Sequence, residues 1–314
     1  MYKFNILKKW LNMQNDNLKM YKRHIRGIYS THDIKNGDYI LVIPSKYIIQ
    51  YSDIKDDYLE NKLKNTNSDI AKYLLLQSIN PKSFYKPYLD SMPSDINEYP
   101  FFYKKSELNQ LKKTSLFCKD AYNFDEQKKH ILYDAKIIYK YLYKKNIITM
   151  DFKEFYALFL KFRVLVCSRV FGYIKNYSEE NAMVPYADLF NHSNNSNTKW
   201  YFDDKKDSFI LEATKNIKKG SEIYDSYGNK SNIQLLRYYS FTIPNNKHSF
   251  VNINHKGYVY HFDKDSKVTD LDLIKKIKDK IIEMKKDLKG GSITNENIVN
   301  IYNDEINIFN SILS

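Results

Sequence analysis

The side chains best suited to chemistry in this chain lie in two short segments, residues 184–193 (VPYADLFNHS) and residues 220–232 (GSEIYDSYGNKSN). Taken singly, each of these side chains could have a purely structural role, because Asn and His are common in turns and the chain holds 29 tyrosines. The order and distance of the two segments are hard to obtain by chance, and they predict one site made from both. Carboxylate, amide, imidazole and phenol groups can hold and orient a ligand through hydrogen bonds. The side chains concerned are Asp188, Asn191, His192, Tyr224 and Tyr227.

Together the two segments resemble the signature segments of SET-domain methyltransferases, in the branch that includes the Rubisco large-subunit lysine methyltransferase. The second segment continues into Leu235-Leu236 and Tyr239-Ser240-Phe241, and residues 87–93 (PYLDSMP) are similar to the helical insert of that branch. The resemblance spans most of residues 22–250. It implies an α+β fold of small curved β-sheets, with a C-terminal motif that threads through a preceding loop, a helical insert and a short C-terminal helical region.

The resemblance and the hydrophobic spacing divide the chain into four parts. Residues 1–52 are expected to form the N-terminal part of the SET domain and residues 53–149 the helical insert. Residues 150–245 are expected to form the C-terminal part of the domain, with the cofactor and catalytic motifs. Residues 246–314 are expected to form a short, mainly helical region on the substrate side. Asp151 followed by Glu154 predicts the start of a helix.

Two β-rich runs at residues 26–30 and 39–44 flank Asn36-Gly37, and this pattern predicts a hairpin. By resemblance, the first turn approaches the cofactor, and Gly27 and Ile28 are the expected cofactor contacts. Ile25 stands where the first of the usual glycines is expected.

The resemblance implies S-adenosylmethionine as cofactor and protein N-methylation as activity. An unperturbed lysine at pH ~7.4 lies about 3 units below its pKa, so presenting the neutral amine costs about 4 kcal/mol. An apolar channel and the positive sulfonium both disfavour the ammonium and lower this cost.

Roles carry over to the positions that match the family motifs. Tyr227 is the expected catalytic residue, which orients the amine rather than deprotonating it. Asn191 and His192 match the cofactor-holding pair. Arg169 is expected to clamp the cofactor carboxylate, because a guanidinium offers a planar fork.

Four further residues are expected to line the acceptor pocket: Ser168, Phe171, Asp188 and Tyr224. The branch that methylates histidine carries a polar amide where Phe171 aligns and a bulky aromatic residue where Ala187 stands. The aromatic Phe171 favours a lysine acceptor. Histidine methylation stays an alternative, and so does a catalytically silent SET-fold module that binds a protein or an acidic surface. Ile25 and Ser240, which depart from expected glycines, favour the silent module.

Composition sets the remaining expectations. The net charge of +13 comes from lysines scattered along the whole chain, so a nucleic acid is not expected as a direct substrate. Cys118 and Cys167 are the only cysteines, which excludes a four-cysteine zinc site, and we expect no metal. No run of 18 apolar residues occurs and the first ten residues do not form a signal peptide, so we expect an intracellular protein, cytoplasmic or nuclear, with a protein substrate.

Overall fold

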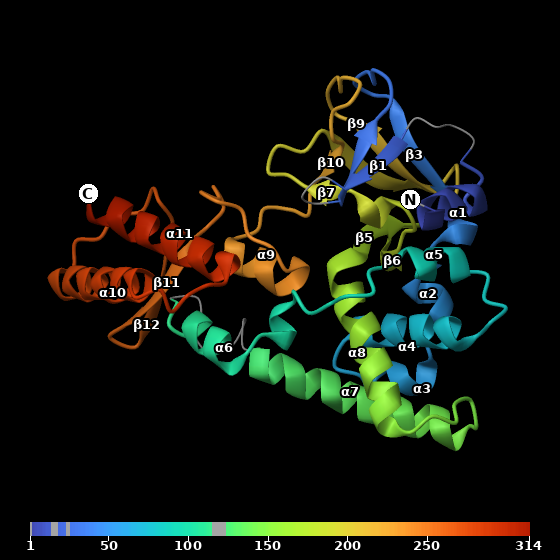
Figure 1. Cartoon of the computed structure of the whole chain (residues 1–314), viewed down its shortest axis with the longest axis horizontal. Helices are drawn as coiled ribbons and strands as arrows, with labels where there is room; N and C mark the ends of the chain where they lie inside the picture. The colour runs from blue at the N-terminus through green and yellow to red at the C-terminus, as the bar shows by residue number, and fades with distance from the viewer. Residues whose placement is uncertain (1, 14–17, 23–25, 115–123) are drawn as a thin grey trace. The chain divides into compact units, whose positions relative to one another are not determined.

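The computed structural model describes residues 2–13, 18–22, 26–114 and 124–314 (Figure 1). The chain forms two compact units, each made of two stretches that are distant in sequence. The first unit contains residues 1–94 and 130–228, and the second contains residues 95–129 and 229–314. The boundary between the units therefore falls inside the segment 53–149, which is expected from the sequence to form one insert.

Small β-sheets form the framework of the first unit. One antiparallel pair joins β1 (Leu18–Lys22) to β2 (Arg26–Ser30), and one parallel pair joins β7 (Asn191–His192) to β10 (Tyr224–Asp225). The two antiparallel sheets of three strands have the orders β3-β9-β8 (Tyr39–Pro44, Ser208–Ala213, Thr198–Asp203) and β4-β6-β5 (Ile49–Gln50, Ser178–Met183, Val170–Lys175).

Helices accompany these sheets, so the first unit has the expected α+β character. They are α1 (Tyr2–Trp10), α2 (Tyr51–Ile54), α3 (Asp57–Glu60), α4 (Thr66–Ile79), α5 (Lys86–Ser91) and α8 (Phe152–Arg169), with the short 3₁₀ turns η1 (Ser45–Tyr47) and η4 (Ala187–Leu189). The helix α7 (Phe124–Lys144) begins in the second unit and continues into the first.

The helix α8 begins where the sequence predicts. The Oδ1 of Asp151 accepts a hydrogen bond of 2.8 Å from the amide of Glu154, which satisfies one of the unpaired N–H groups of the first turn. The helix ends at Arg169, and β5 starts at the next residue. This junction places the Arg169 side chain at the edge of the sheet β4-β6-β5.

The predicted hairpin around Asn36-Gly37 is wrong. The strand β2 pairs with β1 and forms a bridge from Tyr29 to Glu222, whereas β3 pairs with β9. Gly37 does occupy a turn that needs a positive φ, +88°. The local turn chemistry was right, but strand partners are chosen by packing across distant segments rather than by the turn between neighbours.

In the described residues, the second unit has its own hydrophobic core, built by helices and a β-hairpin. The helices are α6 (Lys105–Leu111), α9 (Asn232–Tyr239), α10 (Leu271–Lys289) and α11 (Glu296–Leu313), with the 3₁₀ turn η2 (Pro100–Phe102). The hairpin joins β11 (Val251–His255) to β12 (Tyr258–Phe262). Leu108 and Leu111 of α6 belong to the same buried cluster as the apolar faces of α10 and α11. This shared core explains why part of the predicted insert belongs to the C-terminal unit.

Ser240, one of the departures from an expected glycine, ends α9 in the left-handed conformation with φ 63°. Glycine adopts this conformation without strain, and other residues pay roughly 1–2 kcal/mol for it. A glycine is expected at this position because the backbone is left-handed there. Ser240, which replaces it, lies in the second unit.

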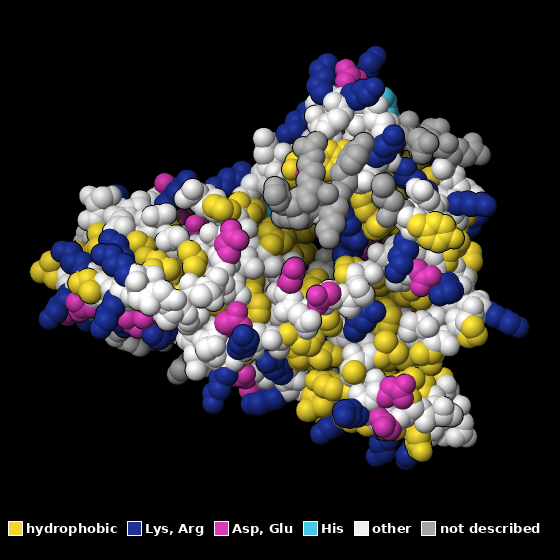
Figure 2. Space-filling view, viewed as in Figure 1, with side chains coloured by type: hydrophobic (Ala, Val, Ile, Leu, Met, Phe, Trp, Pro, Cys, Tyr) yellow, Lys and Arg dark blue, Asp and Glu magenta, His cyan; other side chains and the backbone are white. Residues whose placement is uncertain are grey.

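The charged surface has no single-signed face in the view of Figure 2. In both units, Lys and Arg side chains are interspersed with acidic and hydrophobic ones. Among the described residues, no helix combines the length and the apolarity that crossing a membrane requires.

Candidate active site

The two signature segments meet in space through the parallel pair of β7 and β10. Asn191 lies opposite Tyr224, and His192 lies opposite Asp225. The amide of Ser193 extends the pairing with a 3.0 Å hydrogen bond to the carbonyl of Asp225. Residues more than thirty positions apart are thereby held at adjacent positions.

A strained turn leads into this crossing. Tyr186 has φ 71°, although it is not a glycine, and its side chain is 1% exposed. Such a conformation persists only when the surrounding packing imposes it, and it is common where a backbone must present functional groups. The turn η4 that follows carries Ala187 and Asp188 toward the crossing.

Tyr227 is held at both its backbone and its hydroxyl group. Its hydroxyl donates a 2.7 Å hydrogen bond to the carbonyl of Phe190, and its amide donates a 3.0 Å hydrogen bond to Nδ1 of His192. The rings of His192 and Tyr227 stack at 5.1 Å. Because Nδ1 accepts, the proton of a neutral His192 lies on Nε2, which is 3.2 Å from Oδ1 of Asn194. The imidazole thus positions the tyrosine.

Arg169 and Asp188 form a buried ion pair. Nη1 of Arg169 lies 3.2 Å from Oδ2 of Asp188 and 2.8 Å from its carbonyl oxygen. The Asp188 side chain is 1% exposed, and the hydroxyl of Tyr88 also donates to Oδ2, at 2.9 Å. Burial, with Asp188 nearby, raises the pKa of Tyr88 well above its ordinary value. The Oδ1 of Asp188 is buried without a hydrogen-bond partner among the described residues.

Glu222 connects the first turn of the chain to the crossing. Its carboxylate accepts hydrogen bonds from the hydroxyls of Tyr29 (3.0 Å) and Tyr224 (2.8 Å) and from Nδ2 of Asn191 (2.8 Å). The same Nδ2 donates to the carbonyl of Arg26 at 2.7 Å. Burial and the adjacent Glu222 raise the pKa of Tyr224 to about 12, so its phenol stays protonated.

Gly27 is required by this arrangement. A Cβ at position 27 would lie 2.2 Å from Oε1 of Glu222, whose carboxylate is held by three hydrogen bonds. We expect Gly27→Ala to lower the free energy of unfolding by about 1–3 kcal/mol, because the displaced carboxylate loses partners. Chemical denaturation measures this change. The control is Gly172→Ala, where the nearest atom lies at 3.5 Å and the expected change is within about 0.5 kcal/mol. Equal effects of the two substitutions would contradict the role of Gly27.

The other predicted residues have clear positions. Ile28 is fully buried, and its carbonyl accepts from the amide of Ile223 at 2.8 Å. The hydroxyl of Ser168 donates to the carbonyl of Leu165 within α8. Phe171 is 8% exposed and packs edge-on against Trp200 (5.3 Å) and Phe209 (5.1 Å). Position 171 therefore offers an aromatic surface and no hydrogen-bonding group.

Asp225 is a buried carboxyl that was not predicted as a site residue from the sequence. It is 2% exposed, and burial raises its pKa from the ordinary 3.8 to about 7, against hydrogen bonds from the Ser226 amide and the Trp200 ring. The neutral form is thus favoured in the folded state. Its contribution to stability is fully present below pH 3.8 and is lost as the pH rises through about 7.

We therefore expect the melting temperature of the wild-type protein to fall, relative to that of Asp225→Asn, as the pH increases from ~5 to ~8. Asn keeps the shape of the side chain and does not ionise. Calorimetry of both proteins over this range measures the difference between the curves. The difference isolates Asp225 from Asp304 of the second unit, whose pKa burial raises to about 6. Parallel curves would show that Asp225 does not titrate there.

Three side chains of the site were not predicted from the sequence: Tyr88, Glu222 and Asp225. Tyr88 lies about 100 positions from its partner Asp188, and no local pattern links them. Glu222 and Asp225 lie inside the second signature segment, so their acidic side chains within the motif were a visible signal. Among residues 2–13, 18–22, 26–114 and 124–314, no cluster of His, Cys, Asp and Glu is suited to a metal ion.

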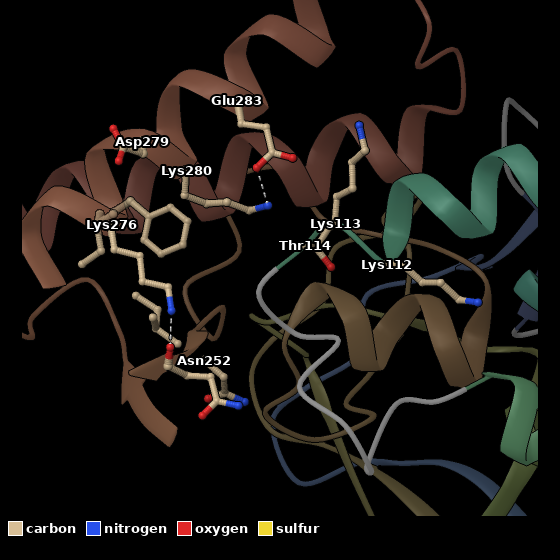
Figure 3. Close-up of a pocket in the computed structure, with 12 residues that line it drawn as sticks. Lys112, Lys113, Thr114, Asn252, Lys276, Asp279, Lys280 and Glu283 are labelled. Carbon is tan, nitrogen blue, oxygen red and sulfur yellow. Dashed lines mark hydrogen bonds and ion pairs between the residues drawn. The ribbon is translucent and has the colours of Figure 1, made fainter. Parts of the chain in front are cut away.

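A separate groove of about 460 Å³ lies within the second unit, between α6, β11 and α10 (Figure 3). Its four lysines already have partners within the chain. Lys112 and Lys113 pair with Asp125 and Asp287, Lys280 pairs with Glu283, and Lys276 donates to the carbonyl of Asn254. None of the predicted site residues lines this groove, so it is distinct from the β7–β10 site.

A family model of the SET domain matches residues 25–228, which is more than half of the chain. The chain therefore belongs to the SET-domain family. The match ends at the residue where the first unit ends, so the SET domain includes the crossing of β7 and β10.

Solved structures similar to the chain include the SET domain of LSMT bound to lysine and AdoHcy, with a TM-score of 0.74, 16% identity, and coverage of 99% of this chain and 90% of that chain. Rubisco LSMT bound to AdoMet gives a TM-score of 0.72 at 15% identity, over 99% of this chain and 89% of that one. At this identity the likeness establishes the fold.

Curated relatives in sequence include actin-histidine N-methyltransferases. The Homo sapiens protein is 24% identical over 247 residues, covering 74% of this chain and 40% of the relative. The Gallus gallus protein is 24% identical over 241 residues, covering 72% of this chain and 39% of the relative. The chain thus spans about two fifths of the length of these relatives.

Proposed function

We propose that this protein is an S-adenosylmethionine-dependent protein methyltransferase whose acceptor is a lysine side chain. The observation that carries the proposal is the convergence of Asn191, His192 and Tyr227 at the crossing of β7 and β10. The SET-domain family and the resemblance to LSMT structures bound to AdoMet or to AdoHcy and lysine support it.

The residues of the site fit the proposed cofactor. Nδ2 of Asn191 has two acceptors, whereas its Oδ1 has no partner among the described residues and suits an ammonium group. Arg169 offers a guanidinium to a carboxylate, fixed in place by Asp188. Gly27 adds no side chain where the first turn approaches Asn191. S-adenosylmethionine would supply a methyl group on a sulfonium.

Tyr227 would orient the acceptor. Its hydroxyl proton points to the carbonyl of Phe190, so the phenol oxygen and that carbonyl oxygen lie together at 2.7 Å. Two oxygens in this arrangement can contact polarised C–H groups and align an amine without accepting its proton. The amine must arrive neutral, and the surrounding apolar side chains lower the cost of its deprotonation.

Phe171 supports lysine as the acceptor. Its ring lies in the aromatic cluster with Trp200 and Phe209, which offers apolar surface to an alkyl chain. Ala187, which directly precedes Asp188, is buried, and its small side chain adds no bulk at the position where the histidine-methylating branch carries an aromatic residue. The second candidate is histidine methylation, which the actin-histidine N-methyltransferase relatives favour.

Mass mapping of the methylated residue after incubation with cell lysate and labelled cofactor separates these candidates. With a lysine acceptor, we expect the rate to rise from pH ~7 toward pH ~9, because the acceptor pKa is about 10.4. A histidine acceptor, with a pKa of about 6.5, would give a rate that levels off near neutrality. A methylated histidine would overturn the lysine assignment.

The silent-module alternative has its own test. A ligand that binds only the folded state stabilises it by about 2.7 kcal/mol at a hundredfold excess over the dissociation constant. A folded protein whose melting temperature does not change in millimolar S-adenosylmethionine would favour a binding module over an enzyme.

A further inference from the structure

The side-chain amide of Asn191 has one defined orientation. An amide offers an oxygen acceptor on one side and two N–H donors on the other, and a rotation by half a turn exchanges them. Nδ2 of Asn191 donates to Oε1 of Glu222 at 2.8 Å and to the carbonyl of Arg26 at 2.7 Å. A carboxylate and a carbonyl accept hydrogen bonds and do not donate them, so the rotated amide would set its oxygen against two other oxygens. The two acceptors therefore fix Oδ1 on the side away from both of them.

Glu222 is itself held in place at its backbone and at its carboxylate. Its carbonyl accepts a 3.0 Å hydrogen bond from Nδ2 of Asn197, and its backbone forms the bridge to Tyr29. Its Oε2 accepts from the hydroxyls of Tyr29 (3.0 Å) and Tyr224 (2.8 Å), which leaves Oε1 for Asn191. All three of these donors are neutral groups, so they position the negative charge without cancelling it. The carboxylate is thus a fixed acceptor for the Asn191 amide.

We infer that Glu222 is a positioning residue that acts through Asn191 and makes the site selective for a ligand with an amino group. By accepting from Nδ2, the carboxylate keeps Oδ1 of Asn191 as the atom available to a ligand donor. A charge-assisted hydrogen bond is about twice as strong as a neutral one, and it polarises the amide so that Oδ1 becomes a better acceptor for an ammonium group. This inference rests on the proposed function, because its ligand is the amino-acid part of the proposed cofactor.

The substitution Glu222→Gln isolates this role. It keeps the shape of the side chain, removes the negative charge and replaces one oxygen by an NH₂ group. If that NH₂ group faces Asn191, the Asn191 amide no longer has two acceptors on one side and can rotate. If the oxygen faces Asn191, the orientation is kept but the charge assistance is lost. In both cases Oδ1 becomes a poorer acceptor for an ammonium group.

The test compares two ligands that differ only in the amino group, S-adenosylhomocysteine and its analogue without the α-amino group. Calorimetric titration measures the affinity of each for the wild-type chain, Glu222→Gln and Glu222→Asp. We expect Glu222→Gln to bind S-adenosylhomocysteine roughly tenfold more weakly and the deaminated analogue within about twofold of the wild type. Glu222→Asp keeps the charge on a side chain one methylene shorter, and we expect a smaller loss, again only for the ligand with the amino group.

The matched control is Glu212→Gln in β9 of the same unit. The Glu212 carboxylate also accepts from a tyrosine hydroxyl, that of Tyr201 at 3.1 Å, and it pairs with Lys199 at 2.8 Å. This substitution should change neither affinity.

Two results with the variants would overturn the inference. An equal loss of both ligands in a folded Glu222→Gln or Glu222→Asp protein would make Glu222 a structural residue, and unchanged affinities for both ligands would show that it does not act on the site. A wild-type chain that binds the two ligands equally well would overturn the inference without any variant. A wild-type chain that binds neither ligand would instead refute the cofactor assignment itself.

Discussion

Tyr227→Phe is expected to lower the rate of methyl transfer by roughly 10²–10³-fold, the usual loss when a preorganised polar group is removed from a reaction centre. The substitution removes one oxygen and its 2.7 Å hydrogen bond to the carbonyl of Phe190. It leaves the ring that stacks on His192 and the backbone amide that donates to Nδ1. Cofactor affinity should therefore stay within about twofold of the wild type, because the loss falls on the chemical step.

Single-turnover kinetics with saturating cofactor, together with calorimetric titration of the cofactor, separate these two quantities. Tyr224→Phe is the matched control, since it also removes a phenol oxygen from the site. That hydroxyl donates to Glu222, which contacts the first turn at Gly27. The control should therefore change the packing of the first turn more than the rate of methyl transfer. Full activity in Tyr227→Phe would remove its catalytic assignment.

Arg169→Met should weaken both cofactor binding and the fold. The substitution leaves the Asp188 carboxylate, whose side chain is 1% exposed, without its cation. Breaking a buried ion pair in this way costs about 3–5 kcal/mol of stability. The guanidinium proposed to hold the cofactor carboxylate is lost as well, so the affinity should fall at least tenfold.

A second substitution separates the two roles of Arg169. In the double variant Arg169→Met with Asp188→Asn, the buried side chain is neutral, so most of the lost stability should return. Cofactor affinity should stay low, because the guanidinium is still absent. Chemical denaturation and calorimetric titration of the single and double variants give both quantities. Recovery of affinity together with stability would show that Arg169 acts only through the fold.

The local elements of the chain could be predicted from the sequence where the residues that start or end an element lie within the same segment. The Asp151 cap defines the start of α8, and in the C-terminal region expected to be mainly helical Asp270 caps α10 through the amide of Leu273. The predicted hairpin around Gly37 failed because β2 and β3 take their partners from distant segments. Turn residues specify a bend, whereas strand partners depend on which buried faces fit together.

The sequence by itself determined the family, the two segments that make the site and the expected roles of Tyr227, Asn191 and Arg169, because motif order and spacing are properties of the chain. Only the tertiary structure showed how Asp188 is used: its carboxylate is bound by Arg169 and Tyr88. It alone also placed Glu222 against Gly27. These contacts join residues 19 to 195 positions apart, and charge balance and burial depend on distances in space that no local pattern encodes.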